Sequence, residues 1–114
     1  MTVYFFDSSA LVKRYVTEIG TSWVRSVTAG SSGNIVFIAK ITRVEMVSAL
    51  MRRKRDGTLS SRTAQAARLY IERHTAREYE VLKLTDALLE QAEALNWHGV
   101  AYVRLECKRP RKLK

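Results

Sequence analysis

The sequence is poor in the residues that crosslink a chain or bind zinc. It has one cysteine, Cys107, and one proline among 114 residues. A single cysteine excludes a disulfide within the chain and is typical of a protein of the reducing cytoplasm. The two histidines, His74 and His98, are far apart, so no zinc-ligand spacing exists, and both are expected at the surface or at helix ends. Neither a Gly-x-Gly-x-x-Gly nor a Walker pattern occurs, which removes the usual phosphate-binding loops.

Long hydrophobic runs are also absent. No apolar run approaches the ~20 residues that a membrane-spanning helix needs. The first run, Val3–Phe6, meets Asp7 after four residues, so we expect neither a signal peptide nor a membrane anchor, and a cytoplasmic location. Hydrophobic residues nevertheless make up 46% of the chain, which is enough for a packed core in one domain.

Acidic residues are in the minority. The chain has 20 Lys and Arg against 11 Asp and Glu, a formal net charge of +9. Residues 108–114 hold five of the basic residues and no acid, so residues 1–107 carry a net charge of only +4. We therefore expect a domain over residues 1–107 and a basic tail that is either solvated or in contact with phosphates. The positive balance favours a polyanion such as nucleic acid, or an acidic protein, as partner.

Short β-prone runs alternate with helical patterns along the chain. Val3–Phe6 and Ile35–Ile38 are apolar on both faces, as buried parallel strands are, and Tyr79–Leu84 is a weaker third strand. Helices are expected over residues 8–19, 21–28, 42–55 and 60–74, and after Thr85. This alternation predicts an α/β fold with helices on the faces of a central parallel sheet. Three strands make a thin sheet, and the chain ends where a fourth would be expected.

The apolar residues of two expected helices define their predicted core faces. In the helix over 42–55 these residues are Val44, Val47 and Met51. In the helix over 60–74 they are Ala66, Leu69 and Tyr70. Tyr70 and the two tryptophans, Trp23 and Trp97, are expected to pack rather than to stack on bases.

Two carboxylates follow the carboxyl ends of predicted strands, where an open parallel sheet binds ligands. Asp7 follows the first strand directly, and Ser8 and Ser9 come next at the start of a helix. Glu45 lies in the first turn of the helix after the second strand. Because the carboxyl ends of neighbouring parallel strands meet at one edge, both acids can face one crevice. They would suit Mg²⁺ or Mn²⁺, which could activate a water and stabilise the charge of a phosphodiester being cut.

Each of these features has a structural alternative. Asp7 is also a good N-cap for the helix that it precedes. Thr42-x-x-Glu45 is also a capping box. The basic run at 52–55 either complements a helix dipole or contacts an RNA backbone.

Three segments of the chain combine into a more specific pattern. Residues 4–13 read YFFDSSALVK, residues 38–50 read IAKITRVEMVSAL, and residues 82–92 read LKLTDALLEQA. In this order and spacing they resemble a PIN domain, in particular a VapC-type toxin of a type II toxin–antitoxin system. The resemblance spans roughly residues 1–99, and it implies a three-layer α/β/α fold.

The resemblance also implies an activity. PIN toxins of this kind are metal-dependent endoribonucleases that hydrolyse RNA phosphodiester bonds with a carboxylate-bound Mg²⁺ or Mn²⁺. Asp7 and Glu45 match the first two acidic positions of the metal site, and Ser9 matches a polar position near the metal. The resemblance further implies an RNA substrate and a small antitoxin protein as partner, and it allows a homodimer. Met46 and Met51 are expected, with Tyr70, in an apolar groove for the antitoxin.

The likeness stops after Gly99. Val103 stands where the family has its third acid, and the fourth motif and the last strands are missing. Glu106, one helical turn beyond Val103, is either a substitute metal ligand or an incidental surface residue. Two interpretations stay open: an active ribonuclease, or a catalytically impaired PIN-derived protein that acts by binding an antitoxin or RNA.

Overall fold

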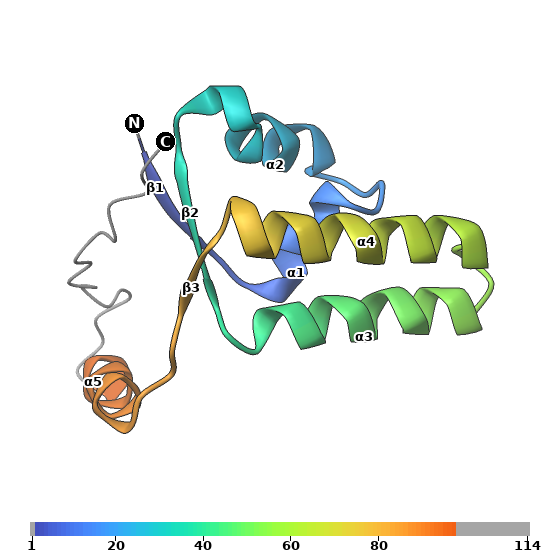
Figure 1. Ribbon diagram of the computed structural model, residues 1–114. Coiled ribbons are helices and arrows are strands. Elements are labelled where there is room, and N and C mark those ends of the chain that lie inside the picture. The colour runs from blue at the N-terminus through green and yellow to red at the C-terminus, as the bar shows by residue number, and fades with distance from the viewer. Residues whose placement is uncertain (1, 98–114) are drawn as a thin grey trace. The chain divides into compact units, whose positions relative to one another are not determined.

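The computed structural model describes residues 2–97, which belong to two compact units (Figure 1). The first unit, Met1–Lys83, contains the sheet. The second begins at Leu84, and its described helix is α5 (Asp86–Trp97), which the Thr85 hydroxyl caps by accepting from the Leu88 amide at 3.2 Å. No helix among the described residues is long and apolar enough to cross a membrane. The expected domain over 1–107 and the expected tail both reach beyond the described residues.

Three parallel strands form the sheet. They are β1 (Val3–Phe6), β2 (Ile35–Ala39) and β3 (Glu80–Leu82), in the order β1-β2-β3. The central strand aligns Ile38 with Phe6 on one side and with Val81 on the other. The predicted α/β class and parallel sheet are therefore confirmed. The third strand is shorter than the predicted Tyr79–Leu84. Tyr79 lies just beyond the C-cap of α4, and its amide donates to the His74 carbonyl at 3.0 Å instead of joining the sheet.

The helices of the first unit follow the strands in the predicted order. They are α1 (Ser8–Leu11), η1 (Val12–Arg14), α2 (Thr21–Thr28), η2 (Gly30–Ser32), α3 (Thr42–Arg55) and α4 (Ser61–Arg77). The first helix ends well before the predicted residue 19. The Thr21 hydroxyl accepts from the Glu18 amide at 2.9 Å and donates to the Val16 carbonyl at 3.2 Å, so it holds residues 15–20 as a loop. Gly20 then adopts a left-handed φ of 94° just before α2, rather than ending the first helix.

Helices α1–α4 gather on one side of the strands in Figure 1. On that side Phe6, Val36 and Ile38 are buried. On the opposite face Val3 and Phe5 are 56% and 53% exposed. The described part of the first unit therefore supplies one helical layer, and the three-layer arrangement implied by the PIN resemblance stays a prediction.

The buried face of α3 differs from the predicted one. Thr42, Met46 and Leu50 are at most 2% exposed, whereas Val44 is 63% exposed and Met51 39%. The buried residues recur every four positions, which places them on one stripe of the helix. The predicted core face through Val44 and Met51 is therefore wrong.

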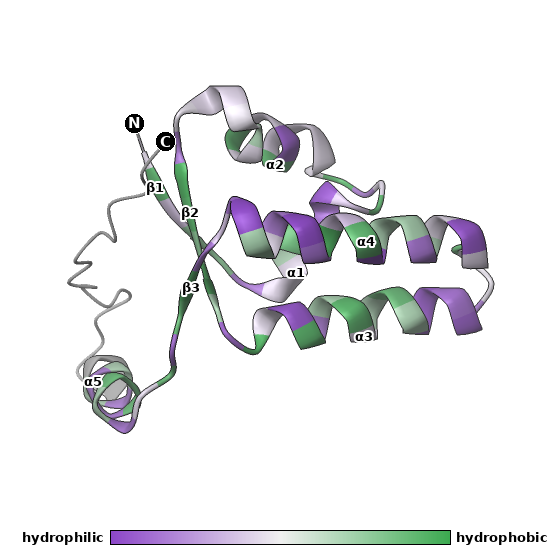
Figure 2. Cartoon of the chain, viewed as in Figure 1, coloured by the Kyte–Doolittle hydropathy of each residue, from purple (hydrophilic) through white to green (hydrophobic). Residues whose placement is uncertain are grey.

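The buried face of α4 differs in the same way. Ala64, Ala67 and Ile71 are buried, and Leu69 and Tyr70 are more than half exposed. Two of the three buried side chains are alanines, which let α4 pack closely against α3. The core of the unit joins these helices to β2, the continuous apolar strand visible in Figure 2.

A polar network fastens η1 to the end of α4. The Arg14 guanidinium donates to the Tyr79 hydroxyl at 2.8 Å and pairs with the Glu78 carboxylate at 3.1 Å. The Tyr15 hydroxyl is hydrogen-bonded both to Nδ1 of His74, at 2.8 Å, and to the Tyr79 hydroxyl. Burial raises the pKa of both tyrosines. Burial, and then the Arg14 charge, lower the pKa of His74. His74 lies in the last turn of α4, so the helix-end alternative predicted for it is confirmed, and its side chain is largely buried there.

His74 should make the fold less stable in mild acid. Its folded-state pKa lies below the ~6.5 expected of the unfolded chain, so unfolding takes up a proton as the pH falls through that value. We expect the free energy of unfolding, measured by urea denaturation, to decrease from pH 7 to pH 5. The decrease should be smaller in His74→Gln, in which the other charges near this position, those of Arg14, Glu78 and Arg73, are unchanged. An equal decrease in both proteins would contradict the role of His74.

Candidate functional site

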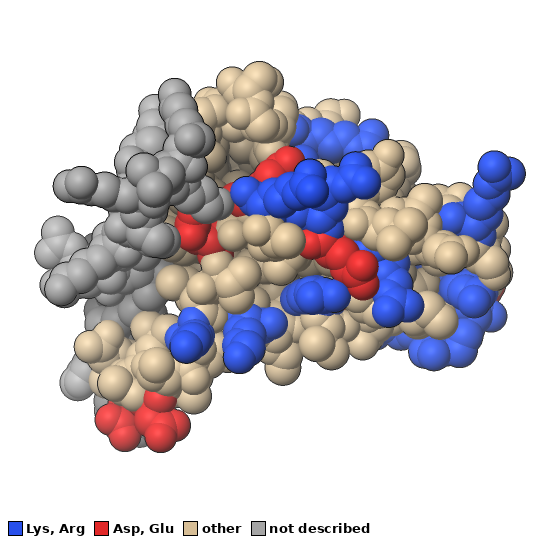
Figure 3. All heavy atoms as spheres, in the orientation of Figure 1, with Lys and Arg blue, Asp and Glu red and all other residues tan. Residues whose placement is uncertain are grey.

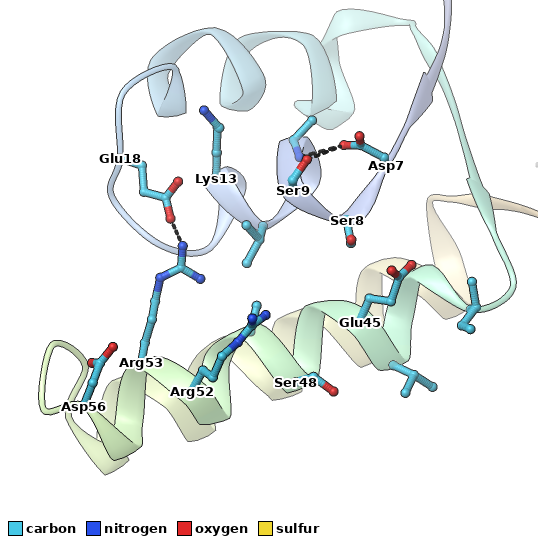
Figure 4. A pocket seen from close by; sticks show the side chains of 15 residues that line it. Asp7, Ser8, Ser9, Lys13, Glu18, Glu45, Ser48, Arg52, Arg53 and Asp56 are labelled. Carbon is cyan, nitrogen blue, oxygen red and sulfur yellow. Dashed lines mark hydrogen bonds and ion pairs between the residues drawn. The ribbon is translucent and has the colours of Figure 1, made fainter.

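A cavity of about 930 Å³ opens between α1 and α3. Asp7, Ser9 and Glu45, the three described residues of the expected site, all line it (Figure 4). The cavity lies at the carboxyl ends of β1 and β2, where an open parallel sheet is expected to bind ligands. The fourth expected residue, Glu106, lies outside the described residues.

Asp7 is both a helix cap and a wall of the cavity. Its Oδ1 accepts hydrogen bonds from the Ala10 amide at 2.8 Å and from the Ser9 hydroxyl at 3.0 Å. The expected N-cap is therefore confirmed. Oδ2 accepts no hydrogen bond from the described residues, so one oxygen of the carboxylate remains available to a ligand. Ser9 fixes the orientation of that carboxylate.

Glu45 has no capping role. The N-cap position of α3 is Ile41, no side chain caps it, and Thr42 is already inside the helix and buried. The capping-box interpretation is therefore wrong. The Glu45 carboxylate makes no hydrogen bond or ion pair with any described residue, and Figure 4 shows it extending from α3 toward the loop that carries Asp7.

The parallel pairing of β1 with β2 brings these two acids together, because it aligns the strand ends that precede them. Asp7 and Glu45 both line the cavity and would offer it carboxylate oxygens, which are the type of ligand that Mg²⁺ and Mn²⁺ prefer. The described residues contain no cluster of three or more His, Cys, Asp or Glu that could hold a metal ion. The donor set therefore fits a hydrated divalent ion held by two carboxylates, with its other positions left to water and substrate oxygens.

Two further acids line the cavity but are engaged elsewhere. Glu18 forms an ion pair with Arg53. Asp56 accepts from the hydroxyl and the amide of Thr58 at 2.7 and 3.0 Å, and these bonds hold its pKa below the usual range. Neither carboxylate is as free as that of Glu45.

Basic side chains form the other part of the cavity wall. Lys13 comes from η1, and Arg52 and Arg53 come from the last turns of α3. The sequence prediction treated residues 52–55 as one block, and the structure separates them. Glu45, Ser48 and Arg52 share one face of α3 at positions i, i+3 and i+7, a spacing that was visible in the sequence.

The expected antitoxin groove is corrected at one position. Met46 lies on the buried face of α3 and is fully buried, so it cannot contact a partner, whereas Met51 and Tyr70 are exposed. Tyr70 stacks on His74, with the ring centroids 6.0 Å apart.

Trp23 makes the packing contacts predicted for it, although it is 55% exposed. Its ring lies edge-on to that of Tyr4, at a centroid distance of 5.9 Å. The side chain of Trp97 lies outside the described residues.

Comparison with known proteins gives no assignment: no family model matches the chain, and no curated protein matches it. The fold class and the geometry of the cavity therefore carry the functional argument.

Proposed function

We propose that the protein is a metal-dependent endoribonuclease of the PIN/VapC toxin type that hydrolyses RNA phosphodiester bonds in the cavity between α1 and α3. The observation that carries the proposal is the pair of acids Asp7 and Glu45. They come from two separate strand–helix connections, line one cavity and keep carboxylate oxygens without a partner among the described residues. The resemblance of residues 4–13 and 38–50 to the first two PIN motifs supports the same two residues.

Asp7 and Glu45 would hold Mg²⁺ or Mn²⁺ in this site. The ion, when bound, supplies an activated water and stabilises negative charge on the phosphate. Ser9 donates to Oδ1 of Asp7 and so keeps that carboxylate from rotating. The basic side chains of the cavity wall attract the RNA backbone, in agreement with the excess of Lys and Arg on the surface in Figure 3.

Glu45→Gln should abolish RNA cleavage and leave the fold intact. The substitution removes one of two charges that would hold the ion, and the ion contributes several kcal/mol to the transition state, so we expect a loss of about 100-fold or more. Cleavage of a labelled single-stranded RNA with Mn²⁺, with and without EDTA, measures this loss. Urea denaturation should show unchanged stability, because the Glu45 carboxylate is exposed and makes no hydrogen bond or ion pair with any described residue.

Glu90→Gln, an exposed acid of α5, is the matched control and should cleave like the wild type. Wild-type activity in Glu45→Gln would contradict the assignment of Glu45.

A second candidate is a catalytically impaired PIN-derived protein that binds an antitoxin or RNA. It is favoured by one observation: the proposed metal site has only the carboxylates of Asp7 and Glu45, and the described residues contain no cluster of three metal-ligating residues. Wild-type protein that binds RNA or a small cognate protein, but cleaves nothing with Mg²⁺ or Mn²⁺, would support it. On either candidate we propose RNA and a small antitoxin as partners and allow a homodimer.

A further inference from the structure

We infer that Arg52 binds a phosphate of the substrate strand, so that bound RNA runs along α3 from Glu45 toward the C-terminal end of the helix. This inference rests on the proposed ribonuclease function and adds the path of the substrate. It follows from the different partners of the three cations that line the cavity.

Two of these cations are held by the protein itself. The Lys13 ammonium donates to the Ile19 carbonyl at 2.9 Å, and the Arg53 guanidinium pairs with Glu18. Both acceptors belong to the loop over residues 15–20. Lys13 binds this loop from η1, and Arg53 binds it from α3. Both side chains are therefore fixed in place by these contacts, although the positive charge of Lys13 still adds to the field of the cavity.

Arg52 is different. Its guanidinium is exposed, lines the cavity and makes no hydrogen bond or ion pair with any described residue. None of its N–H donors is thus engaged by the part of the chain that the structure describes. A planar guanidinium binds phosphate oxygens with two parallel hydrogen bonds, which is the geometry best suited to a phosphodiester backbone.

The helix fixes where that phosphate would lie. Seven residues separate Glu45 from Arg52, which is close to two full turns, so both point from the same face of α3 about 10 Å apart along its axis. Figure 4 shows both side chains extending from α3 toward α1, with Ser48 between them on the helix. A strand cut next to Glu45 must therefore continue past the scissile bond to reach Arg52. A dinucleotide is too short to use this contact fully.

The test compares Arg52→Gln with Arg55→Gln. Arg55 is exposed on the same helix and loses the same charge, but it does not line the cavity. With a ten-nucleotide single-stranded RNA, Arg52→Gln should raise KM about 10-fold and leave kcat nearly unchanged, because it removes a charge-assisted contact to a remote phosphate. With a dinucleotide its effect should be no larger than that of Arg55→Gln. Arg52→Lys should restore part of the affinity, because it keeps the charge and loses the bidentate geometry.

A binding measurement separates this inference from the proposed function. Fluorescence anisotropy with a labelled 2′-O-methyl RNA decamer and no divalent ion reports backbone binding without cleavage. We expect Arg52→Gln to weaken it about 10-fold and to lower the slope of log affinity against log salt by about 0.7.

Each outcome of the two assays has one meaning. If the wild type binds RNA through Arg52 but never cleaves it, the ribonuclease function fails and the RNA path stands. If Arg52→Gln behaves like Arg55→Gln in binding and in KM, or if the wild type does not bind RNA, the path is overturned.

Discussion

Asp7→Asn should eliminate RNA cleavage while leaving the free energy of unfolding within about 0.5 kcal/mol of the wild type. Asparagine caps a helix as well as aspartate does, so its amide oxygen can still accept from the Ala10 amide and the Ser9 hydroxyl. The negative charge that would hold the ion is lost, and we expect activity to fall by about 100-fold or more. Cleavage with Mn²⁺ and urea denaturation on the same protein measure both effects.

Asp7→Ala is the informative companion, because it removes the cap together with the charge. It should lose the same activity and in addition about 1 kcal/mol of stability. The two roles that the sequence left open for Asp7 are thus measured separately. An Asp7→Asn protein that cleaves RNA at the wild-type rate would leave Asp7 as a helix cap alone.

Leu50→Ala should destabilise the fold by about 3 kcal/mol, because the leucine is 1% exposed and its loss leaves a cavity between α3 and the core. That is a large part of the 5–15 kcal/mol by which domains are usually stable. Equilibrium unfolding in urea, followed by circular dichroism, measures the change.

The neighbouring residue provides the control. Met51 is 39% exposed, and Met51→Ala should cost less than about 1 kcal/mol. If the face of α3 predicted from the sequence were the buried one, Met51→Ala would lose more stability than Leu50→Ala. Comparing the two variants therefore shows which face is buried. A larger loss in Met51→Ala than in Leu50→Ala would contradict the packing described above.

The sequence was a good guide to the elements and a poor guide to their faces. The α3 helix has the predicted bounds, 42–55. Its C-terminal end could be predicted because the residues Asp56–Gly57, which favour a turn, follow it directly. Its apolar residues, however, occupy two overlapping stripes, one through Val44 and Met51 and one through Met46 and Leu50. Periodicity alone cannot choose between such stripes, since the choice depends on which one meets α4 and the sheet.

In the candidate site, too, some features could be predicted from the sequence and others could not. Asp7 and Glu45 could be found because each follows a recognisable strand, and the rule for parallel sheets places strand ends together. The difference between Arg52 and Arg53 could not be found in the same way. It depends on Glu18, which lies in a loop far away in the sequence and forms an ion pair with Arg53 but not with Arg52.

The pairing of β1 with β2 also has a consequence for how the protein acquires its site during folding. Phe6 aligns with Ile38, so this contact closes a long loop that contains α1, η1, α2 and η2. Such non-local parallel contacts form slowly, after local helices. A nascent chain that ends before β2 carries Asp7 and its cap but no second carboxylate beside it. On the proposed function, metal binding and RNA cleavage would therefore require the completed sheet and would be absent until β1 and β2 have paired.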